Sequence, residues 1–110
     1  MAEQWTRLPL ADISDQTCLR LPNGHKVAVF HLGDRFYAID DTCTHEEASL
    51  SEGTVYDDED EPQVECPKHG AIFDLETGAV RSLPAVKSVN SYETKVDGDY
   101  LLIATEPRPQ

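Results

Sequence analysis

The chain has 110 residues, a formal net charge of −12 and three cysteines. This is the length of one domain, large enough to bury about two thirds of the surface that its unfolded chain exposes. The excess of 21 acidic over 9 basic residues opposes binding to nucleic acid or to an anionic membrane, and it favours partners with basic surfaces.

The sequence contains no apolar run of the roughly 18–20 residues that a membrane span requires. Its opening, Met1-Ala2-Glu3-Gln4, lacks the basic and then apolar pattern of a secretory signal. We therefore expect a cytoplasmic protein. An odd number of cysteines in such a chain argues against a disulfide framework, and thiolate ligation is the better use of Cys43 and Cys66.

Short β-type runs alternate with turn signals along the first 40 residues. The runs at 17–21, 26–31 and 35–39 are separated by Pro22-Asn23-Gly24 and by Leu32-Gly33-Asp34. Apolar alternation bounded by such turn residues is typical of strands. The segment predicts a meander of three strands.

Two half-motifs follow this strand group. Each supplies one cysteine and one histidine, in Cys43-Thr44-His45 and in Cys66-Pro67-Lys68-His69-Gly70. Thiolate and imidazole ligands suit either Zn²⁺ or a [2Fe–2S] cluster with mixed ligation. Zinc sites of this composition normally take their ligands in like pairs, whereas two mixed loops can clamp a two-iron cluster from opposite sides. The pattern favours the cluster and leaves zinc open.

The C-terminal part repeats the strand pattern. A hairpin is predicted around 73–78, and the runs 91–96 and 100–104 are joined through Asp97-Gly98-Asp99. No segment has a sustained apolar stripe at the helical period. Several short strands at regular spacing predict an all-β sandwich or barrel.

The two half-motifs resemble the cluster-binding loops of Rieske proteins. The resemblance runs from about Trp5 to Thr105 and includes Phe73-Asp74, Thr77-Gly78 and Leu83-Pro84-Ala85, the last like the proline loop that covers the cluster. It implies a single domain over 1–110 with a Rieske-type antiparallel β-sandwich. Its base strands would lie at about 4–40 and 85–105, and a cluster-binding subdomain would be inserted at about 41–84.

The resemblance also implies one [2Fe–2S] cluster and its four ligands. Cys43 and Cys66 would hold one iron, and His45 and His69 the other. Gly53 and Gly70 would allow close backbone approach or a positive φ near the cluster, although ordinary hairpin chemistry explains such glycines equally well.

Departures from one branch of the family are informative. Rieske subunits of respiratory and photosynthetic complexes have an additional cysteine in each loop, which together form a disulfide; Ala48 and Lys68 stand at those positions here. Those proteins also have a serine and a tyrosine that donate hydrogen bonds to sulfur, where this chain has Ala71 and Phe73. Donors near sulfur stabilise the reduced cluster, so we expect a potential near roughly −150 mV rather than +300 mV.

An acidic, low-potential, single-domain Rieske protein most resembles the ferredoxin component of bacterial aromatic-ring-hydroxylating dioxygenases. The resemblance implies a monomeric electron carrier in aromatic hydrocarbon catabolism, not an enzyme. It would accept one electron from a flavin-containing reductase that uses NAD(P)H and pass it to the Rieske centre of a terminal oxygenase. It would bind no organic substrate.

Three other functions fit parts of the pattern. A structural Zn²⁺ domain would use the same four ligands for folding. The small subunit of an assimilatory nitrite reductase has a similar fold, but members without a cluster lack the ligand set that is complete here. A Rieske ferredoxin could also serve iron–sulfur assembly or another oxygenase.

The remaining reactive residues have structural interpretations. Cys18 is predicted to be a small buried hydrophobe on a strand, and His25 and His31 to be solvated. The run 57–61 is predicted to be a solvated acidic loop, with docking as the minority interpretation. Trp5 and the tyrosines are assigned to sheet packing.

Three charged residues adjoin the predicted ligands. Glu46 and Glu47 follow His45, and Lys68 precedes His69. We expect all three to lie near the cluster tip.

Overall fold

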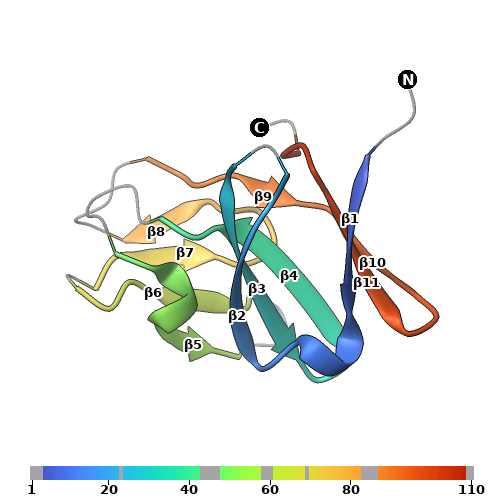
Figure 1. Ribbon diagram of the computed structural model, residues 1–110. Coiled ribbons are helices and arrows are strands. Elements are labelled where there is room, and N and C mark those ends of the chain that lie inside the picture. The colour runs from blue at the N-terminus through green and yellow to red at the C-terminus, as the bar shows by residue number, and fades with distance from the viewer. Residues whose placement is uncertain are drawn as a thin grey trace.

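The computed structural model describes residues 4–22, 24–42, 48–57, 61–68, 70–82 and 87–108. Across these ranges the chain forms eleven strands and two short 3-10 helices (Figure 1). All strand pairs are antiparallel, which confirms the predicted all-β fold. Neither helix of the described segments is long and apolar enough to cross a membrane.

Three sheets contain the eleven strands. The outer sheet has the order β1-β11-β10, with β1 at Trp5–Pro9, β11 at Tyr100–Ala104 and β10 at Thr94–Asp97. The central sheet has the order β2-β3-β4-β9, with strands at Gln16–Arg20, Lys26–Leu32, Arg35–Asp40 and Ser91–Tyr92. The third sheet has the order β5-β6-β7-β8, with strands at Thr54–Tyr56, Gln63–Glu65, Ile72–Asp74 and Val80–Ser82. The helices are η1 at Leu10–Asp12 and η2 at Leu50–Glu52.

The central sheet is buried on both faces. Val27 and Val29 of β3 pack in one core with Leu101 of the outer sheet, whereas Ala28 and Phe30 pack in a second core with side chains of the third sheet. Successive side chains of a strand point to opposite faces, so a continuous apolar run marks a strand covered on both sides. Burying a side chain as large as Phe30 contributes about 1.5–3 kcal/mol, which fixes the third sheet onto the central one.

Four strands lie where alternation predicts them. The runs 17–21, 26–31, 35–39 and 100–104 are confirmed, to within one residue at each end, as β2, β3, β4 and β11. The hairpin predicted around 73–78 is confirmed as the β7–β8 connection.

The single strand predicted at 91–96 is wrong. It is broken at Glu93 into β9, which pairs with β4, and β10, which pairs with β11. The carbonyl of Glu93 accepts the N–H of Ala104 at 2.9 Å, so the chain changes partner at this residue. The break carries the backbone from the central sheet to the outer sheet.

Candidate metal centre

The second half-motif begins directly after β6. The N–H of Cys66 donates to the carbonyl of Ala71 at 2.7 Å, and the N–H of Gly70 donates to the carbonyl of Cys66 at 3.3 Å. Gly70 has a φ of 76°, which glycine adopts without the penalty that a Cβ would add. These features close a tight turn that begins at Cys66 and hold the backbone of Cys66 in place.

Cys66 is 2% exposed and belongs to the second core. Ala71 and Phe73, which stand where the respiratory and photosynthetic Rieske subunits have sulfur-directed donors, are fully buried in that same core. Within the described residues Cys66 is a free thiol. The side chain of Cys66 therefore lies among apolar residues and has no disulfide to another described residue.

The other three predicted ligands, Cys43, His45 and His69, lie outside the described residues. Within the described part of the chain, no three His, Cys, Asp or Glu side chains gather as a metal site. What the structure does describe is the chain on either side of these ligands.

The first half-motif is flanked by two residues that pair with each other. Thr42 and Ser49 form an isolated antiparallel bridge, and the N–H of Leu50 donates to the carbonyl of Asp41 at 2.6 Å. The chain that leaves β4 and the chain that enters η2 therefore lie side by side. Residues 43–47, which contain Cys43 and His45, connect them.

Gly53 provides a close approach between the two half-motifs. A Cβ at Gly53 would overlap the carbonyl oxygen of Glu65, the residue before Cys66. Its φ of −78° is ordinary, so space rather than backbone conformation requires glycine here. Close approach at Gly53 and positive φ at Gly70 are thus both confirmed.

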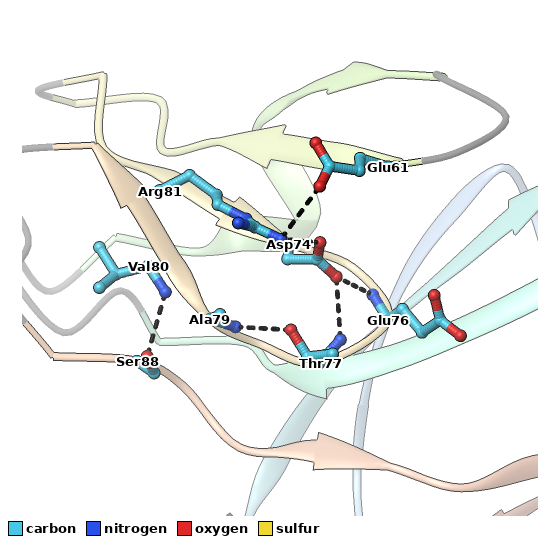
Figure 2. Close-up of polar contacts among 8 residues, drawn as sticks. All are labelled: Glu61, Asp74, Glu76, Thr77, Ala79, Val80, Arg81 and Ser88. Carbon is cyan, nitrogen blue, oxygen red and sulfur yellow. Dashed lines mark hydrogen bonds and ion pairs between the residues drawn. The ribbon is translucent and has the colours of Figure 1, made fainter.

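A buried carboxylate organises the β7–β8 turn (Figure 2). One oxygen of Asp74 accepts the N–H groups of Glu76 and Thr77 at 2.8 and 3.0 Å, and the other lies 3.0 Å from the guanidinium of Arg81. Burial by itself would raise the pKa of Asp74, but the hydrogen bonds from Arg81, Thr77 and Glu76 outweigh it, and the pKa is lowered. The network supports the strand that leads to Leu83-Pro84-Ala85, residues outside the described part.

Asp74→Asn should lower the free energy of unfolding at neutral pH by about 1–2 kcal/mol, because Asn loses the charge-assisted bond to Arg81. A carboxylate whose folded pKa is lowered stabilises the fold above its unfolded pKa of about 4, and this contribution is lost as the pH falls through the folded value. The curves of unfolding free energy against pH should therefore converge in acid. Denaturant titrations from pH 7 to pH 3 check this, with the exposed Glu61→Gln as control, and a constant difference would contradict it.

The prediction that Cys18 is buried is wrong. Leu19, the next residue on β2, packs against the core between the outer and central sheets, so the alternation of side chains turns Cys18 to the opposite face. There Cys18 is exposed, because β2 is an edge strand of the central sheet. Partial desolvation raises the pKa of the Cys18 thiol, and the nearby carboxylate of Asp41 raises it further. A thiol held protonated in this way is a poor nucleophile and a poor metal ligand.

The predicted solvation of the two remaining histidines is half right. His25 is exposed. His31 is half-buried and stacks on Phe36, with ring centroids 4.2 Å apart and planes inclined by 12°. Stacking on the aromatic ring explains why His31 is packed rather than solvated.

The acidic run and the aromatic residues match their predicted roles in part. Asp57 and Glu61 are exposed, as expected of a solvated loop, and Glu61 pairs with Arg81 at 3.5 Å; the residues at 58–60 lie outside the described part. Sheet packing holds for the buried Tyr92, but Tyr56 and Tyr100 are 46% and 37% exposed.

Asp40 and Asp41 are structural residues that the sequence did not reveal as such. Asp40 accepts the hydroxyl of Tyr92 at 2.7 Å and the N–H of Asn90 at 2.9 Å, whereas Asp41 accepts the hydroxyl of Ser49. Their position three and two residues before Cys43, at the end of β4, was the available signal.

Comparisons with known proteins agree on one family. A profile described as the Rieske [2Fe-2S] domain matches residues 9–93. The 3-phenylpropionate/cinnamic acid dioxygenase ferredoxin subunit of Escherichia coli strain K12 is 41% identical over 95 residues, which are 86% of this chain and 87% of that protein.

Solved structures give the same result. The ferredoxin of carbazole 1,9a-dioxygenase from Nocardioides aromaticivorans IC177 is 36% identical, with a TM-score of 0.81 over 91% of this chain and 96% of that one. A chain in the complex of reduced oxygenase and oxidized ferredoxin in carbazole 1,9a-dioxygenase is 32% identical, with a TM-score of 0.85 over 99% and 100% of the two chains. A nitrite reductase small subunit from Mycobacterium tuberculosis shares the fold alone, at 24% identity.

Proposed function

The chain belongs to the Rieske [2Fe–2S] domain family, and from this membership we propose that it carries single electrons between two protein partners. The donor is a flavin-containing reductase that uses NAD(P)H, and the acceptor is the Rieske centre of a terminal aromatic-ring-hydroxylating dioxygenase. The observation that carries the proposal is the 41% identity to a dioxygenase ferredoxin subunit over 86% of the chain.

The chain has one Rieske-type [2Fe–2S] cluster, the cofactor of its family. It is an electron-transfer component rather than an enzyme, in keeping with relatives that are named as ferredoxins. In this proposal it acts as a monomer in the cytoplasm and binds no organic substrate.

Four residues hold the cluster in this proposal: Cys43, His45, Cys66 and His69. Two thiolates and two imidazoles are the ligand set that Rieske clusters require. Cys66 fits this role because its thiol is buried and, within the described residues, free, and because the turn that Gly70 allows holds its backbone in place. When bound, the cluster supplies a one-electron couple, and the apolar residues around Cys66 limit the access of water to the sulfur side.

The third sheet forms the cluster-binding subdomain in this proposal. All four of its strands lie within 41–84, between β4 and β9 of the central sheet. The turn that begins at Cys66 follows β6 of this sheet, and the Thr42–Ser49 bridge that flanks the first half-motif lies between β4 and η2. The outer and central sheets form the base in this proposal, at about 4–40 and 85–105.

Partners dock on the loop tips in this proposal, because the histidine ligands offer the shorter path for an electron to a partner's cofactor. Lys68 is exposed next to His69, and Glu46 and Glu47 adjoin His45. The net charge of −12 favours partners with basic docking faces.

Reversing the charge of Glu46 and Glu47 should slow reduction by the cognate reductase roughly tenfold or more at low salt, because charges at a docking face steer association. The effect should weaken at physiological ionic strength, where the screening length is about 8 Å. Stopped-flow reduction of the oxidised ferredoxin, at several protein and salt concentrations, measures it.

The matched control reverses the charges of Asp97 and Asp99, which changes the net charge by the same amount. Both are exposed at the β10–β11 hairpin, and Figure 1 places that hairpin at the opposite end of the molecule from the β6–β7 connection. Neutralising the run 57–61 should matter less than the change at Glu46 and Glu47. If the rate of reduction does not change in the Glu46 and Glu47 variant but falls sharply when the run 57–61 is neutralised, partners dock on the acidic loop instead.

A further inference from the structure

The chain segments that flank the two half-motifs are joined by one continuous set of contacts. We infer that Asp41 and Gly53 are positioning residues that set the spacing between the two half-motifs, and through it the geometry of the cluster. The inference rests on the proposed ligand set. A covalent tie between the loops is unavailable, because the only cysteine besides Cys43 and Cys66 is Cys18 on β2.

Asp41 closes the first loop at its base. The residue is 4% exposed, and one of its carboxylate oxygens accepts the N–H of Ser51 at 3.0 Å. The hydroxyl of Ser49 lies 2.8 and 2.7 Å from the two oxygens of the same carboxylate. A buried charge is stable only when it is hydrogen-bonded, so these donors hold the two stems of the loop together.

Gln16 fixes the C-terminal end of η2 to the central sheet. Its side-chain amide donates to the carbonyls of Ser51 and Gly53, both at 2.8 Å. The N–H of Gly53 in turn donates to the carbonyl of Leu50 at 3.0 Å. The helix η2 is therefore held to β2 at one end and to Asp41 at the other.

Gly53 transmits this position to the second half-motif. Because a side chain at Gly53 would overlap the carbonyl oxygen of Glu65, the two backbones are in direct contact. The next residue, Thr54, is paired with Glu65 in the β5–β6 ladder. Leu50 packs in the same core as Cys66. The path thus runs from Asp41, two residues before Cys43, to Glu65, one residue before Cys66.

The neighbouring carboxylate, Asp40, makes contacts of similar kind in a different place. It binds the hydroxyl of Tyr92 and the N–H of Asn90, which belong to β9 and the segment before it. Removing the Asp40 carboxylate should therefore disturb the central sheet, while the contacts of Asp41 with Ser49 and Ser51 stay in place. This gives a control that differs from Asp41 by one position in the sequence.

The test compares Asp41→Ala, Asp41→Asn and Gly53→Ala with Asp40→Ala in the intact, cluster-loaded protein. The readouts are the rate of cluster loss to an iron chelator, the electron paramagnetic resonance spectrum after reduction, and the unfolding midpoint. We expect Asp41→Ala and Gly53→Ala to lose the cluster about tenfold faster or more, with altered spectra, since residues that support metal ligands have effects of this size. Asp41→Asn keeps an acceptor for Ser51 and should restore a rate close to that of the unaltered protein.

Asp40→Ala should lower the unfolding midpoint yet leave the spectrum and the rate of cluster loss unchanged. Equal rates and unchanged spectra for Asp41→Ala and Asp40→Ala would overturn the inference. If Asp41→Ala takes up no cluster, full loading of Asp40→Ala supports the inference and equal failure of both overturns it. The iron and sulfide content of the unaltered protein is measured first. If the unaltered protein holds neither, the proposed function itself is refuted.

Discussion

Replacing Cys66 with alanine should remove the [2Fe–2S] cluster while the fold survives. The substitution deletes a thiolate that iron requires, but it places a small apolar side chain in a site that is 2% exposed and lined by apolar residues. Alanine at Cys43, His45 or His69 should have the same effect, because a Rieske cluster needs all four ligands. Iron and sulfide content of the purified variants measures the loss, and circular dichroism checks the fold.

The matched controls are Cys18→Ser, His25→Ala and His31→Ala. Cys18 is exposed on β2 with its thiol pKa raised, and His31 is stacked on Phe36, so none of these changes should remove the cluster. Normal iron and sulfide in Cys43→Ala, or their loss in Cys18→Ser, would show that the ligands are assigned incorrectly.

A new donor near the sulfur should raise the reduction potential. Ala71→Ser and Phe73→Tyr each add a hydroxyl in the core that contains Cys66. A hydrogen bond to sulfur that favours the reduced state by about 1–1.5 kcal/mol raises a one-electron potential by roughly 45–65 mV. Protein-film voltammetry of the two variants against the unaltered protein gives the shift.

If the reduction potential does not shift, the stability of the variants decides how that result is interpreted. Phe73 is fully buried, and a tyrosine hydroxyl without a partner there would destabilise the fold by about 1–3 kcal/mol. Phe30→Tyr is the matched control, because Phe30 is equally buried in the same core but lies on β3 of the central sheet. An unchanged potential with a destabilised fold in both tyrosine variants would mean that position 73 does not face the cluster.

The longer strands were predictable because they carry their own signal. The runs that became β3 and β11 have five to seven residues, enough to show alternation or a continuous apolar stretch between turns. The strands β5, β6 and β8 have three residues each, too few to show a period. They are strands because each pairs with a neighbour already in place.

Other features depend on partners far away in the sequence. Glu93 looks like an ordinary strand residue, yet the pairing changes there from β4 to β11. Cys18 and Leu19 are both compatible with a core, and only the packed sheet decides which of them faces inward. The separate tasks of Asp40 and Asp41 follow from Asn90, Tyr92, Ser49 and Ser51, which no local pattern connects to them.

The family was the most predictable feature, because the resemblance depends on residue types. Cysteine and histidine in two mixed pairs favoured a cluster and resembled the Rieske loops, and the family is confirmed. The assignment of Cys43, His45, Cys66 and His69 as ligands stays a prediction. The supports of the site were harder to find. Gly53 is required by a backbone contact with Glu65, which exists only once β5 and β6 are paired.

The electron paramagnetic resonance spectrum of the dithionite-reduced protein, taken with its metal content, tests the central claim most directly. We expect a red-brown protein with iron and sulfide in equal amounts, whose reduced form gives the low-average-g signal of a two-iron cluster with mixed histidine and cysteine ligation. A colourless, redox-silent protein that contains zinc and no sulfide would contradict the account.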